Sequence, residues 1–189
     1  MNDVNRFSAA VLAGGKSTRM GRDKAALRLN GLTLAAHQAE KLKALGVRDL
    51  MLSGWQQEIP GARFVPDELP ARGPLGGIHA CLGAAEQNAV LFLSVDVPLV
   101  PVETLRALLD AHTGGVTLLS ADGVPQPLIG VYDRSLRAPA EEILRSENTA
   151  VRRLLEISPL RLVEYAGDPG LLRNCNTPAD YEWLVGMIL

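Results

Sequence analysis

The chain has 189 residues, of which 47% are hydrophobic, so it can bury the core of one domain of ordinary size. Its formal net charge is −2, and only 4% of its residues are aromatic. Binding of nucleic acid or of a membrane surface would need extended positive charge or stacking rings, so we expect neither partner and a single domain over residues 1–189.

The two cysteines, Cys81 and Cys175, do not have the spacing of a metal site. We expect both to be structural thiols in a reducing compartment. No stretch approaches the roughly 18 apolar residues of a membrane span, and no signal peptide is expected before the first strand. These features predict a cytoplasmic protein.

Hydrophobic periodicity predicts strands and helices that alternate along the chain. In chain order we expect a strand over 7–12, a helix over 33–45, strands over 49–52 and 62–65, a helix over 78–86, a strand over 89–95, a helix over 105–112, strands over 116–120 and 128–132, helices over 136–145 and 151–157, a strand over 161–164, and a helix that begins after Thr177. This alternation favours an α/β fold with a mostly parallel sheet covered on both faces.

The most informative motif follows the first strand, where an apolar run ends in Gly14 and Gly15. Glycines allow a tight turn whose free backbone N–H groups attract anions. Lys16, Arg19 and Lys24 then add positive charge where a polyphosphate would lie. The loop therefore predicts a nucleoside triphosphate site at the end of the first strand. The alternative is an ordinary turn with solvated cations.

Two better-known phosphate loops do not fit this segment. A Walker A loop would need a glycine where Ala10 stands. A dinucleotide fingerprint would need separated glycines, but Gly14 and Gly15 are adjacent.

Polar residues also follow the next predicted strands, at Ser53, Asp67 and Asp96. Open α/β sheets bind ligands at the carboxyl ends of their strands, so we expect these side chains at one site. Beside a phosphate loop, Asp96 is predicted to bind Mg²⁺, because a metal ion held by substrate phosphates needs only one or two protein oxygens. Taken alone, a carboxylate at this position would more often cap the next turn.

Weaker signals for anion binding lie further along the chain. Gly73 and Gly77 belong to a cluster that opens a helix, which could bind an anion or simply allow close packing. The residues that could meet an anionic acceptor are Gln126, Arg152, Arg153, Asn174 and Asn176. The alternatives are that the two arginines point into solvent and that Asn176 shapes the turn before Thr177.

Residues 12–24, with the pattern Leu-Ala-Gly-Gly-Lys-Ser-x-Arg-Met-Gly-x-Asp-Lys, resemble the signature of the molybdenum cofactor guanylyltransferases. These are nucleotidyltransferases of the nucleotide-diphospho-sugar type. Residues 73–77 (Gly-Pro-Leu-Gly-Gly), 95–98 (Val-Asp-Val-Pro) and 174–178 (Asn-x-Asn-Thr-Pro) match that family in the same order. The resemblance covers roughly residues 8 to 185.

The resemblance implies a three-layer α/β/α sandwich around a mostly parallel, Rossmann-like sheet. It implies transfer of GMP from GTP to molybdopterin cofactor, with Mg²⁺ as cofactor and pyrophosphate as the second product. Proteins that deliver the cofactor, and molybdoenzyme chaperones, are its expected protein partners.

Residue by residue, the resemblance implies that Leu12 to Gly14 contact the nucleotide, Lys24 the phosphates, Asp67 the guanosine and Asp96 the metal. The full expected nucleotide site is Leu12, Ala13, Gly14, Gly15, Lys24, Ser53, Asp67, Gly73, Gly77 and Asp96, with Arg19, Lys24 and Asp96 acting in catalysis. The sequence departs from the family at Ser53-Gly54, where the family often has Asn-x-Asn and uses the first amide to bind guanine.

Two other readings of the same residues stay open. A related nucleotidyltransferase could use CTP, or a sugar phosphate as acceptor. The chain could also be a nucleotide-binding regulator without turnover. Lys24 and Asp96 argue against that reading, because a pure binder does not need a metal carboxylate.

Overall fold

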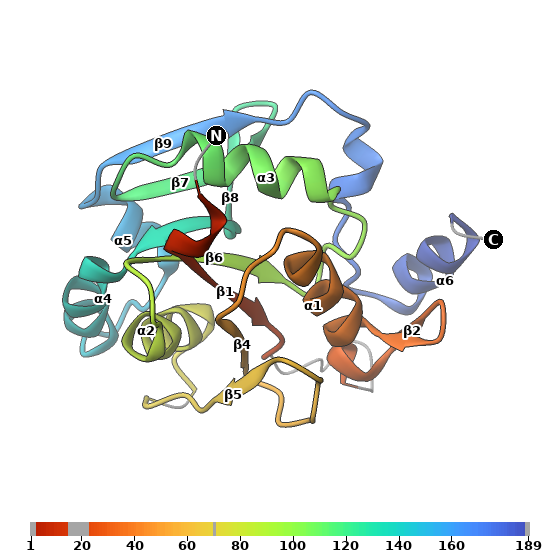
Figure 1. Ribbon diagram of the computed structural model, residues 1–189, viewed down its shortest axis with the longest axis horizontal. Coiled ribbons are helices and arrows are strands. Elements are labelled where there is room, and N and C mark those ends of the chain that lie inside the picture. The colour runs from red at the N-terminus through yellow and green to blue at the C-terminus, as the bar shows by residue number, and fades with distance from the viewer. Residues whose placement is uncertain (1–2, 15–22, 70, 188–189) are drawn as a thin grey trace.

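The protein is described here by a computed structural model, which covers residues 3–14, 23–69 and 71–187. The strands of its central sheet are β1 (Phe7–Leu12), β4 (Leu50–Ser53), β5 (Arg63–Val65), β6 (Ala89–Ser94), β7 (Val116–Ala121), β8 (Val124–Asp133) and β9 (Leu160–Glu164). They lie in the order β5-β4-β1-β6-β8-β7-β9 (Figure 1). Among these strands, β8 alone runs antiparallel to its neighbours, so the predicted mostly parallel sheet is confirmed.

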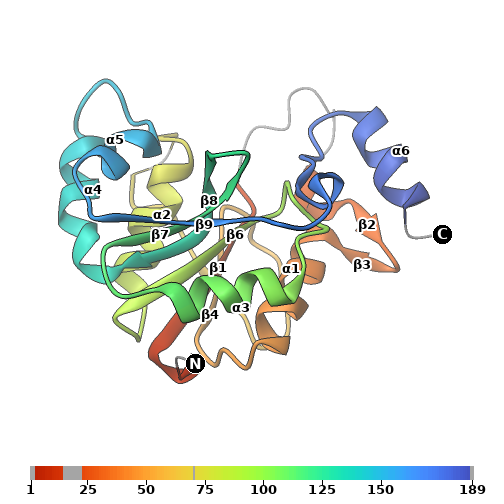
Figure 2. The same ribbon diagram turned by 90° about the horizontal axis from the view of Figure 1, so that it is seen from above.

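The helices are α1 (Leu34–Ala44), α2 (Pro74–Ala84), α3 (Val102–Ala111), α4 (Arg137–Leu144), α5 (Val151–Glu156) and α6 (Pro178–Gly186). Short 3₁₀ turns occur at η1 (Val4–Arg6), η2 (Lys24–Ala26), η3 (Arg134–Leu136) and η4 (Pro169–Leu172). Helices α1 and α3 cover one face of the sheet, and α2, α4 and α5 cover the other (Figures 1 and 2). The three-layer arrangement is therefore the one expected.

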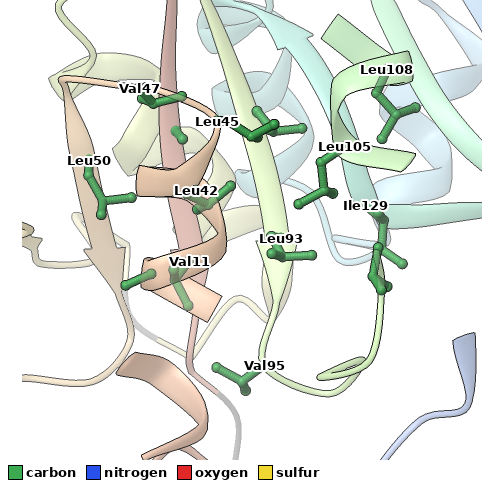
Figure 3. Close-up of a cluster of buried hydrophobic side chains, with 14 of the residues drawn as sticks. Val11, Leu42, Leu45, Val47, Leu50, Leu93, Val95, Leu105, Leu108 and Ile129 are labelled. Carbon is green, nitrogen blue, oxygen red and sulfur yellow. The ribbon is translucent and has the colours of Figure 1, made fainter. Parts of the chain in front are cut away.

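Alternation along the central strands divides the core into two layers. In β1, Ala9 and Val11 face the α1–α3 layer, whereas Ala10 and Leu12 face the α2–α4 layer. Successive side chains of a strand point to opposite faces, and both faces are covered, so every residue of β1 is buried. Figure 3 shows the first layer, where Leu42 of α1 packs with Val11 and Leu93 of the strands beneath it.

The second glycine cluster opens α2 earlier than predicted. The helix begins at Pro74 and not at residue 78, because Gly73 turns the chain with φ of 69° and Pro74 supplies a φ suited to the first helical position. Gly76 and Gly77 therefore lie within the first turn of α2 and are buried.

A smaller unit lies at the end of the molecule away from α4. The hairpin of β2 (Arg28–Leu29) and β3 (Leu32–Thr33) lies beside α6 (Figures 1 and 2). The helix predicted to begin after Thr177 is present, and Thr177 and Asp180 form a capping box at its start. None of the described helices is both long and apolar enough to cross a membrane.

Candidate active site

The carboxyl ends of four parallel strands are level with one another. In the registers of the sheet, Val65 pairs with Ser53, Ser53 with Leu12, and Leu12 with Ser94. The residues that follow these strand ends leave the sheet at the same edge. This alignment brings together the predicted site residues Gly14, Ser53, Asp67 and Asp96, which are far apart in the sequence.

The loops after β1 and β4 touch through two glycines. A Cβ atom on Gly54 would lie 2.3 Å from the Cα of Gly14, and Gly54 has a φ of 81°. Any other residue at position 54 would therefore be strained by its backbone conformation and would collide with the first loop. The Gly14–Gly54 contact leaves exposed backbone at the sheet edge, since both residues are exposed.

Ser53 and Asp67 form the side of the site next to α2. The buried Ser53 hydroxyl donates a hydrogen bond of 3.4 Å to Asp67 Oδ1. A Cβ atom on Gly77 would lie 2.6 Å from Ser53 Oγ, so Gly77 provides the room that this hydroxyl occupies. Burial raises the pKa of Asp67, and the hydrogen bond from Ser53 opposes that shift. A half-buried carboxylate is thus held next to the exposed glycines.

The opposite side of the site gathers three polar side chains from distant segments. Lys24 Nζ lies 3.0 Å from Asp96 Oδ1 and 2.5 Å from Asn176 Oδ1. Lys24 belongs to η2, Asp96 follows β6, and Asn176 precedes α6. Asp96 is held from the backbone as well, because its carbonyl oxygen accepts a 2.7 Å hydrogen bond from the N–H of Cys175. The segment before α6 is therefore attached to the loop that carries Asp96.

One residue of this region was not indicated by any motif. Gln38 of α1 is fully buried, and its Nε2 donates to the carbonyl oxygens of Ser94 (2.6 Å) and Val97 (3.1 Å), on either side of Asp96. Its sequence signal is a polar residue in the apolar stripe of a helix, between Ala35 and Leu42.

Three of the remaining predicted acceptor residues have partners elsewhere, and the fourth is exposed. Gln126 Nε2 donates to the carbonyl oxygen of Val124 in its own strand β8. Arg152 pairs with Glu156 on α5, and Arg153 donates to Ser146 in the preceding loop. Asn174 is exposed. The contacts named here do not connect these residues to the Lys24–Asp96–Asn176 group.

The structure describes only the start of the glycine loop. Gly15 and Arg19, like Lys16, lie outside the described residues, so their predicted roles in binding phosphate and in catalysis stay predictions. Leu12 and Ala13 are buried at the end of β1, where the Ala13 N–H donates to Ser53 O and the Leu12 carbonyl accepts from Val95 N. Gly73 is the exposed N-cap of α2.

A family model described as the MobA-like NTP transferase domain matches residues 9–165. The chain belongs to this family. The match covers most of β1, the segment after it and the other strands of the central sheet, so it includes Gly14, Asp67 and Asp96.

Relatives of full length agree with this assignment. A protein of Methanothermobacter thermautotrophicus named probable molybdenum cofactor guanylyltransferase is 36% identical, over 92% of this chain and 96% of the relative. One of Carboxydothermus hydrogenoformans with the same name is 31% identical, over 96% of both. The crystal structure of molybdopterin-guanine dinucleotide biosynthesis protein A from Archaeoglobus fulgidus has the same fold, with a TM-score of 0.79, 22% identity, and coverage of 95% of this chain and 97% of that one.

Proposed function

We propose that this MobA-like protein transfers GMP from GTP to the phosphate of molybdopterin cofactor and releases pyrophosphate. The names of its full-length relatives support the reaction. The observation that carries the proposal is the group of Lys24, Asp96 and Asn176 beside the exposed Gly14–Gly54 contact. A cationic side chain and metal-binding oxygens next to open backbone are what a polyphosphate substrate requires.

The nucleotide would lie across the ends of β1 and β4. Without side chains at Gly14 and Gly54, the base can approach the main chain closely. Asp67 can accept a hydrogen bond from the nucleoside, because its carboxylate is half-buried at the same edge. Gly73 and Gly77 at the start of α2 complete the proposed nucleotide site.

Charge neutralisation is the main chemical task in this reaction. An oxygen of the acceptor phosphate must attack the α-phosphorus in line, and both reactants are anions. Lys24, together with Arg19 of the glycine loop, would stabilise the negative charge that develops on the departing pyrophosphate. The acceptor phosphate is itself the nucleophile, so the protein has only to align it and need not form a covalent intermediate.

The residues present fit a magnesium ion. Asp96 Oδ1 and Asn176 Oδ1 both contact the ammonium of Lys24, so two oxygens that could bind a cation lie close together. Carboxylate and amide oxygens bind hard cations, and Mg²⁺ usually takes its other ligands from substrate phosphates and water. When bound, Mg²⁺ would neutralise charge on the transferred group.

Candidate residues for the acceptor site come from several segments of the chain. They stay Gln126, Arg152, Arg153, Asn174 and Asn176. Of these, Asn176 contacts Lys24, which also contacts Asp96. We infer that molybdopterin cofactor reaches the site from cofactor-delivery proteins, and that molybdoenzyme chaperones receive the product. Two buried free cysteines suit action in the cytoplasm.

The reaction can be tested with the purified protein, Mg²⁺, GTP and molybdopterin cofactor. We expect pyrophosphate release that needs both substrates, and a guanine dinucleotide product detected by mass spectrometry. GTP binding without any product would favour a nucleotide-binding regulator and contradict the proposal.

A second candidate is the same transfer with CTP. The observation that favours it is Ser53, which has one hydroxyl where the family often has an amide, and that hydroxyl already donates to Asp67. A panel of the four nucleotides in the same assay would separate the two reactions.

A further inference from the structure

The loop that carries Asp96 is held from inside the protein by helix α1. Gln38 of this helix has no exposed surface, and its single Nε2 atom donates to two backbone carbonyls, those of Ser94 and Val97. These carbonyls belong to the residues that bracket Val95 and Asp96. Gln38 therefore spans the turn at whose tip the carboxylate lies.

The chemistry of this contact requires an amide. Carbonyl oxygens only accept hydrogen bonds, so the side chain facing them must donate twice, which the NH₂ group of glutamine does. Leucine would fill the space without a donor, and ionised glutamate would place negative charge against two carbonyl oxygens.

The glutamine is a poor choice for stability alone. Among the described residues, its Oε1 atom has no hydrogen-bond partner although it is buried. A buried acceptor without a partner lowers stability, so we expect the donor half of the amide to have a role other than stabilising the fold.

The main chain of Asp96 is tied down on its other sides too. Its N–H donates to Ser94 Oγ at 3.2 Å, and its carbonyl accepts from Cys175 N. The carboxylate itself stays 31% exposed, and one of its oxygens contacts the ammonium of Lys24. Rigid backbone with an accessible carboxylate is the arrangement that a preorganised metal ligand needs.

We propose that Gln38 is a positioning residue for Asp96: by holding the carbonyls of Ser94 and Val97, it fixes the turn so that the Asp96 carboxylate faces the metal and the phosphates. This inference rests on the proposed function, since it assumes that Asp96 binds Mg²⁺ together with the nucleotide. It assigns a role to α1, which contributes no side chain to the proposed nucleotide site.

The test measures GTP binding by calorimetry twice for each protein, once with saturating Mg²⁺ and once with a chelator. The ratio of the two dissociation constants is the gain in affinity that the metal provides. In Gln38→Leu we expect this gain to shrink about tenfold, while binding without metal is unchanged. The turnover rate in Mg²⁺ should fall together with the metal-dependent gain. An unchanged gain in a folded Gln38→Leu protein would overturn the proposal.

A matched control lies one residue away. His37 Nε2 lies 3.1 Å from the carbonyl oxygen of Pro98, so it contacts the same loop beyond the turn of Asp96. His37→Leu should lower thermal stability without changing the metal-dependent gain. If both variants reduce the gain equally, Gln38 acts only by holding the loop in general and the proposal is wrong.

Gln38→Glu gives a further readout. When protonated, the glutamic acid offers one O–H donor, and when ionised it offers none. Relative to wild type at each pH, the metal-dependent gain of this variant should therefore recover as the pH is lowered. A gain that does not vary with pH would count against the donor role.

The same experiment on Asp96→Ala separates the two levels of inference. If that variant keeps the full metal-dependent gain, the metal assignment in the proposed function has failed. If it loses the gain and Gln38→Leu keeps it, the proposed function stands and only the positioning role is overturned.

Discussion

The ammonium of Lys24 lies 3.0 Å from a carboxylate oxygen of Asp96, although the two residues are 72 positions apart in the chain. Lys24 comes from the segment after β1, and Asp96 follows β6, the strand that pairs with β1. Both side chains are mostly shielded, at 16% and 31% exposure. The pair joins the expected phosphate-binding cation to the expected metal ligand in one contact.

Asp96→Ala should abolish turnover and leave the fold intact. The carboxylate lies at a partly exposed strand end, so its removal should affect the core little, whereas loss of a metal ligand should cost several kcal/mol in the transition state, or on the order of a thousandfold in rate. Steady-state pyrophosphate release measures the rate, and circular dichroism checks the fold. A folded variant with near-wild-type rates in Mg²⁺ would remove Asp96 from the metal site.

Lys24→Ala should raise the GTP dissociation constant at least about tenfold, or about 1.4 kcal/mol, and lower the rate, because its ammonium can contact phosphate as a point charge. Lys43→Ala is the matched control: Lys43 lies on α1 and pairs with Glu40 at the surface. Calorimetric titration with GTP compares the two. Equal affinities for both variants would mean that Lys24 does not contact the phosphates.

Gly54→Ala should weaken both folding and GTP binding. Gly31 has the same φ of 81° but has open space around the position of a Cβ atom, so Gly31→Ala measures the backbone strain alone. That strain is about 1–2 kcal/mol, and the collision with Gly14 should add about 1–3 kcal/mol in Gly54→Ala. Denaturant unfolding measures both variants. If both variants lose the same free energy of unfolding, the close approach of Gly54 to Gly14 does not restrict the residue at position 54.

GTP should be preferred over CTP and ATP by at least about tenfold, or roughly 1.4 kcal/mol. A base that pairs with the exposed main chain at Gly14 is selected because the wrong base leaves polar groups without partners. Competition of GTP against CTP, with a common acceptor, measures the preference. Equal or better use of CTP would show that the main chain at Gly14 does not select the base.

Stability should rise with pH between about 8 and 10.5 because of Lys41. Its ammonium is largely buried and donates to the carbonyl oxygens of Pro98 and Val100. Burial lowers the pKa of Lys41 from 10.5 to about 8, so in this range the unfolded chain binds the additional proton. Over this range the free energy of unfolding should increase by about 3 kcal/mol, and this increase should be absent in Lys41→Met.

Chemical unfolding at a series of pH values tests this slope. Comparison with Lys41→Met at each pH removes the contributions of other groups that titrate in the same range. A parallel rise in both proteins would assign the effect to those groups and not to Lys41.

Local patterns were sufficient for most of the fold. The strand over residues 7–12 and the start of the last helix after Thr177 were predicted where they occur, because apolar runs and helix starts involve neighbours within a few residues. The start of α2 was predicted four residues late, because the glycines after Pro74 are poor helix formers when considered alone. Close packing against Ser53 explains why a glycine is suitable at position 77.

The sequence by itself determined the class of fold, the family and the candidate residues at strand ends. It could not determine which of them meet. Asn176 reaches Lys24 only because the segment before α6 returns to the loop after β6, where Cys175 N donates to Asp96 O. Likewise, the sequence shows Gln38 only as a polar residue in a helix. Its contacts with Ser94 and Val97 appear only in the folded protein. Contacts between distant segments are set by strand order and packing, which no local pattern encodes.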